Sequence, residues 1–400
     1  MYKRIYLLAF FFLAFVGTNI LTAYGFWGNS FWSTINPALY ILIVSTILSG
    51  GLHAKLVVNK HCIYLFVSFL IVVLGKIVSS TGGAWPTPIC FFLIPFFFCF
   101  LLDEKDNNMR DSILKLLISF FIIDCVWGIC EKITMVNVFP QVHGGYVMHY
   151  DTAESFRSSG LQGSALTNSL CLTAIYLVVL ISRLKNKYKL ILFGLGYISL
   201  MCYNTRTSMI LWPVVLVLYY LFISKYNAAQ KFLIGVLLLF FTLFVFNIAS
   251  QYSFGLRLFS GEDLIDDSAN VRLDTIAMFF NIDIFDLFFS FGYSGDEMEK
   301  LMFKNDISII ENSWILHIFW YGGLGLVLIV LSYYKLLKHY MHGYSKFQMI
   351  MTLGAFLLLG STNNGLKEIP LTIFLLSVYS IPVTKEHKVC NKKLQKYFED

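Results

Sequence analysis

A long polar stretch interrupts the apolar chain over residues 251–312 and continues into an apolar helix. It contains SFGLRLFSGEDLIDDSANVRLDT at residues 253–275 and leads into IIENSWILHIFWYGGLGLVLIVL at residues 309–331. The first segment carries Arg257, Arg272 and several carboxylates, whereas most of the surrounding chain is compatible with hydrocarbon. Because charged groups are costly in lipid, this stretch must lie in water or in a polar cavity, where chemistry can occur.

The composition is that of a polytopic integral membrane protein. Of 400 residues, 57% are hydrophobic, 17% aromatic and only 14% charged, and the mean hydropathy is +0.69, well outside the usage of soluble domains. The formal net charge of +6 arises mainly from Lys and Arg in short segments between apolar runs, so it describes topology and not nucleic-acid binding. Eight cysteines show no CxxC pair and no Cys/His ligand spacing, and we expect no disulfide scaffold, metal or cofactor.

Apolar runs bounded by charge, Gly or Pro predict about twelve transmembrane helices in a single all-α domain that covers residues 1–400. Two of the runs are short and are also consistent with a helical hairpin that turns just inside the outer face; they cover residues 190–203 and 207–223. The other runs are 5–23, 35–52, 62–78, 88–102, 113–130, 164–182, 232–249, 313–331, 348–362 and 369–384.

The basic residues predict an orientation. With both termini in the cytoplasm, twenty-one of the thirty Lys and Arg residues lie on the cytoplasmic side, eight lie outside, and Lys76 lies within a span. The two long loops, residues 131–163 and 251–312, are then external. Because no soluble domain remains, we expect function at these loops and at the polar ends of the helices.

The first external loop ends in HGGYVMHYDTAESFRSSGLQGSALTNSL at residues 143–170. Arg157 precedes a turn with Gly160 and Gly163, whose backbone can approach a ligand closely, and a helix that begins here would present free N–H groups to an anion. The alternative is a capped helix start with an arginine near the membrane interface.

Two further arginines are candidates for binding an anion. Arg206, in YNTRTSMILWP, lies between two apolar runs, and it either faces a polar cavity or snorkels to the outer interface. Arg272, in DDSANVRLDTIAMFF, begins a predicted amphipathic or re-entering helix. Its guanidinium either forms a surface ion pair with Asp267 or Asp274, or holds a phosphate through two hydrogen bonds.

Glu311 and Asn312 stand where the polar stretch enters the apolar helix. The helix dipole favours a carboxylate at this position whatever its role, and the functional alternative is a general base or a ligand for a sugar hydroxyl. Gly322 and Gly325 form a small-residue patch that admits another backbone closely. His317 is expected to be a packed or hydrogen-bonded residue and not a catalyst.

These features together resemble the O-antigen ligase and O-antigen polymerase superfamily of bacterial envelopes. The family has a loop exit of the form His-[Asn/Ser/Gln]-x9-Gly-x-x-Gly, and residues 311–325 match it with Glu311 in place of the histidine. The likeness covers roughly residues 150–330. It includes the turn after Arg157, the TRTS segment at Arg206, and NVRLDTIAMFF followed by SFGYSG.

The resemblance implies an all-helical membrane glycosyltransferase of the GT-C type in the bacterial inner membrane. Such an enzyme acts at the periplasmic face on glycans linked to undecaprenyl pyrophosphate, with no nucleotide sugar and no required metal, and both long loops would be periplasmic. The implied catalytic residues are Glu311, Arg206 and Arg272, and the implied substrate-binding residues are Arg157, Asn312 and Arg257.

The absence of the ligase-type histidine favours a polymerase over a ligase. A flippase or transporter is the alternative from another class, but it would spread polar residues through several spans, whereas here they gather in two external loops. The expected partners are the lipid-linked glycan and membrane lipid, with a chain-length regulator and a flippase as possible protein partners, and no nucleic acid.

Overall fold

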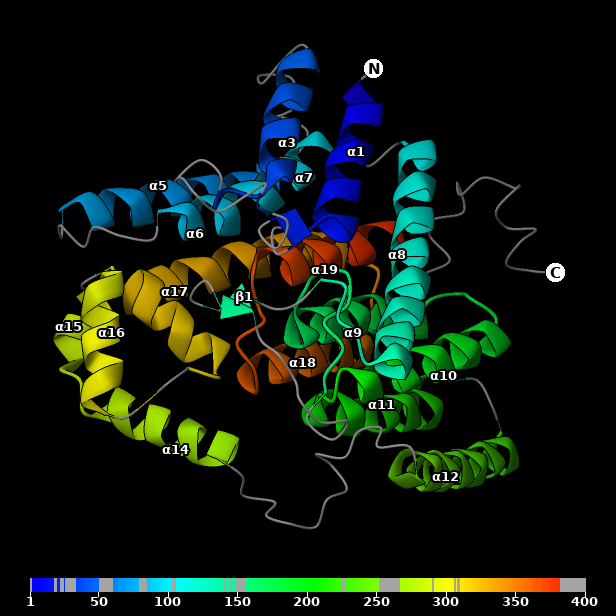
Figure 1. Cartoon of the computed structure of the whole chain (residues 1–400). Coiled ribbons are helices and arrows are strands. Elements are labelled where there is room, and N and C mark those ends of the chain that lie inside the picture. The colour runs from blue at the N-terminus through cyan, green and yellow to red at the C-terminus, as the bar shows by residue number, and fades with distance from the viewer. Residues whose placement is uncertain are drawn as a thin grey trace.

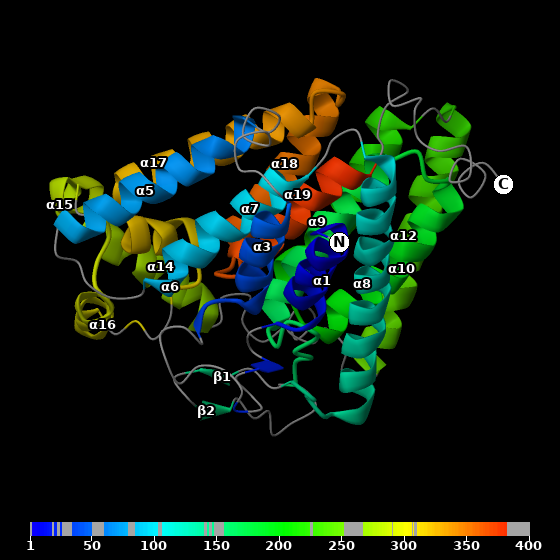
Figure 2. The same cartoon turned by 90° about the horizontal axis from the view of Figure 1, so that it is seen from above.

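The chain folds into a bundle of helices (Figure 1). A computed structural model describes residues 2–17, 20–21, 25, 34–49, 60–78, 85–102, 106–139, 142–143, 146–147, 156–224, 227–251, 267–289, 291–305, 307 and 310–381. The side chain of Arg272 and those of some other helical residues lie outside this description. Two strands of two residues each, β1 (Val142–His143) and β2 (Tyr146–Val147), form an antiparallel hairpin in the loop between α8 (Asn107–Thr134) and α9 (Ala165–Ile181), which the sequence predicts to be external (Figure 2).

The α-helices of the first half of the chain are α1 (Tyr2–Phe15), α3 (Pro37–Leu48), α5 (Ile63–Val78), α6 (Pro86–Pro88), α7 (Ile94–Leu101), α8 (Asn107–Thr134), α9 (Ala165–Ile181) and α10 (Asn186–Cys202). Those of the second half are α11 (Arg206–Leu218), α12 (Ala228–Gln251), α14 (Asp267–Phe280), α15 (Ile284–Phe289), α16 (Gly295–Lys304), α17 (Ser313–Tyr340), α18 (Lys346–Ser361) and α19 (Glu368–Ser380). Short 3₁₀ or π segments, Lys60–Cys62, Ile89–Leu93 and Tyr219–Ile223, extend α5, α7 and α11.

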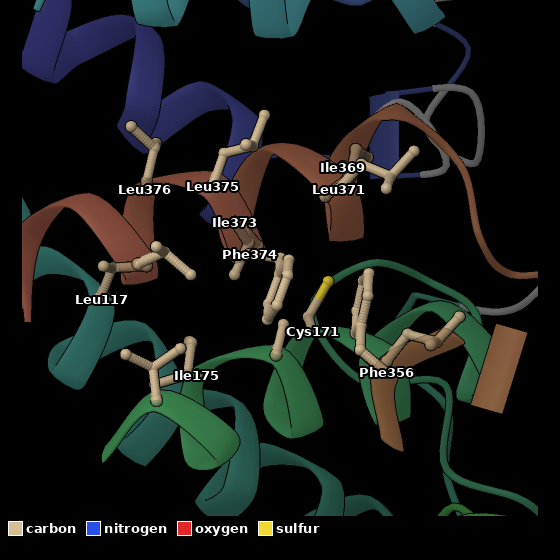
Figure 3. Close-up of a cluster of buried hydrophobic side chains, with 14 of the residues drawn as sticks. Leu117, Cys171, Ile175, Phe356, Ile369, Leu371, Ile373, Phe374, Leu375 and Leu376 are labelled. Carbon is tan, nitrogen blue, oxygen red and sulfur yellow. The ribbon is translucent and has the colours of Figure 1, made fainter. Parts of the chain in front are cut away.

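Helices α9 and α19 form the centre of the bundle. Almost every residue of both helices is buried, and neither helix has a polar face, as expected for helices surrounded by other helices. Figure 3 shows the packing between them, where Phe374 of α19 lies beside Cys171 of α9. Phe374 also stacks on Phe356 of α18, with the ring centroids 4.3 Å apart.

In the described part of the chain, four helices are long and apolar enough to cross a membrane. They cover Lys60–Val78, Asn107–Thr134, Arg206–Ile223 and Ser313–Tyr340. Large apolar side chains are exposed on their surfaces, for example Val78 and Phe222, as expected for surfaces that face lipid. Each of the twelve predicted ranges overlaps a helix, but several helices are short: α3 has twelve residues, which corresponds to about 18 Å against a hydrocarbon thickness of about 30 Å.

Contacts between loops join segments that the sequence predicts to lie on the same side of the membrane. At the expected cytoplasmic end, Lys3 forms an ion pair with Asp106, and His61 stacks on His339 with ring centroids 4.1 Å apart. Burial opposes ionisation of Asp106, but hydrogen bonds from Lys3 and the Met109 amide outweigh it and lower the pKa of this carboxyl. The loops predicted to be external meet one another in the same way, as described below.

The described part of the 251–312 stretch forms a helical unit on α17, at the opposite side of the molecule from α12 in both views (Figure 1, Figure 2). The helix predicted around Arg272 is present as α14. An apolar cluster holds the unit, and its members include Met278, Leu287 and Phe319.

Gly322 and Gly292 bring the backbones of this unit and of α17 into close contact. Gly322 interrupts α17 with φ +71°, and a Cβ on it would lie 2.9 Å from the Phe291 amide nitrogen. A Cβ on Gly292 would lie 2.2 Å from the Trp320 carbonyl oxygen. The close backbone approach predicted for this glycine patch is therefore present at Gly322, while Gly325 faces a side chain, that of Val72.

Candidate functional site

One cavity brings together three of the residues that the sequence singles out. Arg157, Arg206 and Glu311 come from three different segments that the sequence predicts to be external, and they line the cavity together. It contains about 530 Å³ of empty space including its open mouth. These are the only ionisable residues in its described lining, so two guanidinium groups face one carboxylate. The remaining lining residues are Leu166, Asn204, Thr205, Thr207, Ser208, Leu359, Thr362 and Asn363.

Arg206 is the first residue of α11, and the chain turns sharply before it. Asn204 has φ +52°, in the left-handed region, which ends α10 and allows α11 to begin two residues later. Thr205 is the N-cap of α11, but its side chain makes no capping hydrogen bond to the helix. The cavity is therefore lined by a helix N-terminus that carries an arginine at its first position, an arrangement that favours an anion.

Arg157 is held against the end of α10. Its Nε donates a hydrogen bond to the Tyr203 carbonyl at 3.3 Å, and its own carbonyl accepts from Asn137 Nδ2 at 2.9 Å. The next residue, Ser158, donates from its amide to the Cys202 carbonyl at 3.1 Å and from its hydroxyl to the Gly128 carbonyl at 2.6 Å. The backbone around Arg157 is thus fixed to two helices, α8 and α10.

Two buried carboxylates of α8 hold the turn that follows Arg157. Glu131 accepts hydrogen bonds from the amides of Ser159 at 2.8 Å and Gly160 at 2.9 Å. Asp124 accepts from the Leu161 amide at 2.9 Å and from the Tyr203 hydroxyl at 2.8 Å. These bonds satisfy both carboxylates at 2% and 0% exposure, where an ionised group without partners would be very costly.

At residues 159–161 the backbone of this turn is not available for the predicted binding of an anion. The amides of Ser159, Gly160 and Leu161 are bonded to Glu131 and Asp124 and are not available to a ligand. The alternative of a capped helix start is confirmed, because the Ser164 hydroxyl accepts from the Thr167 amide at 3.5 Å.

The two glycines of the turn serve its conformation. Gly160 has φ +64° and Gly163 has φ +63°, values that favour glycine. A Cβ on Gly160 would also lie 2.5 Å from Asn168 Nδ2. Their role is therefore to allow the turn to pack against the protein.

Neither Glu131 nor Asp124 is among the candidate residues that the sequence singles out. The signal that identifies them is their separation of seven residues in an otherwise apolar run, which places both on one face of α8. The predicted span ended at residue 130, but α8 continues to Thr134 and buries Glu131 and Lys132. Lys132 donates to the Phe156 carbonyl at 3.3 Å, which adds a further support to the loop.

Glu311 lies two residues before the first residue of α17. Asn312 is the N-cap of α17, and its Oδ1 accepts from the amides of Trp314 at 2.9 Å and Ile315 at 3.2 Å. Ser313 then donates from its amide and its hydroxyl to the Asn363 carbonyl, at 2.9 and 2.6 Å. This contact fixes the start of α17 beside the loop between α18 and α19, and Asn312, predicted to bind substrate, has a capping role.

The other predicted site residues lie outside the cavity or outside the described residues. His317 is buried and its Nε2 bonds to the Leu366 carbonyl at 2.9 Å, which confirms the expected packed histidine. Arg257 and the side chain of Arg272 lie outside the described residues. Within the residues that the structure describes, no group of three or more His, Cys, Asp or Glu side chains could hold a metal ion.

The chemistry that this arrangement supports is the binding of an anion beside a carboxylate that can accept a proton. Guanidinium groups bind phosphate oxygens through paired hydrogen bonds, and Glu311 faces the same space as Arg157 and Arg206. Comparison of the chain with protein-family models, with curated proteins and with solved structures finds no match.

Proposed function

We propose that the protein is an O-antigen polymerase, a membrane glycosyltransferase that joins undecaprenyl-pyrophosphate-linked oligosaccharide repeat units at the periplasmic face of the bacterial inner membrane. The observation that carries the proposal is the cavity that gathers Arg157, Arg206 and Glu311. In the proposed topology, twelve segments of a GT-C-type fold cross or enter the membrane, both termini are cytoplasmic, and the cavity opens to the periplasm.

The reaction transfers a glycan from one lipid diphosphate to a sugar hydroxyl. The acceptor oxygen attacks the anomeric carbon of the donor, the bond from that carbon to the diphosphate oxygen breaks, and undecaprenyl pyrophosphate leaves with the bonding electrons. The acceptor proton passes to Glu311, which acts as general base. Arg206, the N-terminus of α11 and Arg157 stabilise the charge that develops on the diphosphate, and Arg272 completes this set in the proposal.

The position of Glu311 supports a polymerase over a ligase. In the family that the chain resembles, ligases have histidine at the position of Glu311, and the only histidine nearby on α17, His317, is buried and bonded to the Leu366 carbonyl. At this position the chain therefore offers a carboxylate as the base, whereas the ligases have a histidine side chain.

The function is tested by a gel of lipopolysaccharide from a strain that lacks the protein. Loss of a polymerase leaves lipid A-core that carries a single repeat unit, so the ladder of longer chains disappears. Bare core in place of the single-unit band would contradict the proposal. Bare core is the result expected for a ligase or a flippase, and for a flippase the lipid-linked units also accumulate at the cytoplasmic face.

The site is tested in the same strain with plasmid-borne variants. Arg206→Lys and Arg272→Lys keep a positive charge but lose the planar guanidinium, and each is expected to abolish long chains while the protein still inserts. Arg183→Lys is the matched control, because Arg183 is exposed and follows α9 at the opposite end of that helix from the cavity. Normal ladders from both Arg206→Lys and Arg272→Lys, at normal protein level, would contradict the diphosphate-binding role.

A further inference from the structure

The wall of the cavity formed by the α10–α11 turn holds three buried polar atoms without a partner. Among the described residues, no hydrogen bond reaches Asn204 Oδ1, Thr205 Oγ1 or Ser208 Oγ. The exposure of these three residues is 3%, 6% and 0%, and all three line the cavity. Buried polar groups are almost always hydrogen-bonded, and each one that is not lowers the stability of the fold.

The wall formed by the α18–α19 loop is built in the opposite way. The Thr362 hydroxyl donates to the Leu359 carbonyl at 3.0 Å, and Asn363 Oδ1 accepts from the Gly365 amide at 2.9 Å. These two side-chain oxygens of the wall are therefore bonded within the protein. The unpartnered atoms thus belong to one wall, the one that also carries Arg206.

Local conformation supports a ligand-binding role for the α10–α11 turn. Thr is a favoured N-cap because its hydroxyl accepts a bond from the helix, yet Thr205 makes no such bond to α11. Asn204 adopts φ +52°, a conformation that asparagine tolerates better than most residues, but its side-chain oxygen makes no hydrogen bond within the turn. The turn therefore keeps polar side chains that do not serve its own folding.

The hydrogen-bonding capacity of these atoms identifies the ligand group. Asn204 Oδ1 can only accept a hydrogen bond, and the oxygens of an ionised diphosphate are also only acceptors, so a diphosphate cannot satisfy it. The group beside Asn204 must bring a donor of its own, a hydroxyl or an amide N–H. The hydroxyls of Thr205 and Ser208 can donate or accept, and so they suit the same kind of group.

We infer that Asn204, Thr205 and Ser208 form a subsite for the hydroxyl or amide groups of the sugar that is joined directly to the lipid diphosphate. The inference rests on the proposed function, because it places that diphosphate at Arg206. The sugar and the diphosphate are consecutive groups of one ligand, and Arg206 lies between Thr205 and Ser208 in the chain. One short segment would then bind the two groups on either side of the bond that breaks.

The test measures how tightly the purified full-length chain binds two lipids. One is undecaprenyl pyrophosphate without sugar, and the other is the undecaprenyl-pyrophosphate-linked unit extracted from the strain that lacks the protein. Wild type is expected to bind the sugar-bearing lipid more tightly. Ser208→Ala and Thr205→Val should each weaken binding of the sugar-bearing lipid about three- to tenfold and leave the bare lipid within about twofold, while Thr205→Ser stays close to wild type and Arg206→Lys weakens both.

A matched control separates binding from folding. Ser380 also has a buried hydroxyl without a partner among the described residues, but it lies at the far end of α19, about 18 Å along the helix from Glu368. Ser380→Ala should leave both lipid affinities unchanged. Neither Ser208→Ala nor Ser380→Ala should lower the melting temperature of the unliganded protein, and a marked drop for Ser208→Ala alone would overturn the subsite by showing a structural role.

The remaining outcomes distinguish the subsite from the proposed function. If wild type binds neither lipid, the proposed function fails together with the subsite. If wild type binds the bare lipid as tightly as the sugar-bearing one, or if Ser208→Ala and Thr205→Val weaken both lipids equally, the subsite is overturned while the diphosphate site stands.

Discussion

Two turns meet at the cavity, and they are built in opposite ways. In the turn after Arg157, the amides of three consecutive residues are bonded to buried carboxylates of α8. In the turn between α10 and α11, three buried side-chain atoms have no partner among the described residues. The first turn is therefore a support, and the second is the one that we propose as a binding surface. Changes in the first should affect folding, and changes in the second should affect ligand binding.

The largest expected effect is that of Glu131→Ala. The change leaves the Gly160 amide and the Ser159 hydroxyl without their buried acceptor and removes one of the two acceptors of the Ser159 amide. Since each unsatisfied buried donor costs about 1–3 kcal/mol, the free energy of unfolding should fall by about 3–5 kcal/mol. Unfolding of the purified protein in detergent, followed with denaturant, measures this. Glu299→Ala on the exposed face of α16 is the control and should change little. Equal stability of the two variants would contradict the supporting role of Glu131.

A smaller loss is expected for Gly160→Ala. The new Cβ would lie 2.5 Å from Asn168 Nδ2 and 2.7 Å from the Tyr203 hydroxyl, at a residue with φ +64°. Backbone strain and overpacking should together lower the free energy of unfolding by about 2–4 kcal/mol. Gly194→Ala in α10 is the matched control: a Cβ there meets no atom within 4 Å, and the change should raise stability by about 0.5–1 kcal/mol. The same unfolding assay compares Gly160→Ala with Gly194→Ala. If Gly194→Ala also lowered the free energy of unfolding, the assay would be reporting something other than packing.

The smallest effect on stability is expected in the second turn. Asn204→Gly removes the unpartnered side-chain oxygen and replaces a residue at φ +52° by one that adopts this conformation readily. The free energy of unfolding should therefore change by less than about 1 kcal/mol. The affinity for the sugar-bearing lipid should nevertheless fall. If stability fell as far as in Gly160→Ala, the two turns would not differ in role.

The helices and part of the site are predictable from the sequence, because both have strong local signals. Apolar runs between charges are the strongest local signal in a membrane protein, and charges with little shelter, such as Arg206, stand out against them. The apolar pattern locates the ends of a helix only roughly: the run predicted from residue 35 begins as a helix at Pro37, because Asn36 caps α3 and proline suits its first position.

The supporting network was not predictable in the same way. The hydrogen bonds that Asp124 and Glu131 accept from the turn and from Tyr203 span 28 to 79 positions in the chain, and no local pattern encodes such partners. Their separation on one helix face indicates only that both face the protein interior. For the same reason, Asn312 had a recognisable position but an ambiguous role, since an N-cap and a substrate ligand use the same residue type.

The central claim is that Glu311 takes the proton of the attacking sugar in the cavity beside Arg157 and Arg206. The direct measurement is the rate at which purified protein extends lipid-linked repeat units in single-turnover conditions, for wild type and for Glu311→Gln. We expect Glu311→Gln to lower this rate about 10²- to 10⁴-fold and to retain the affinity for undecaprenyl pyrophosphate. A Glu311→Gln variant that extends chains at the rate of wild type would contradict the claim.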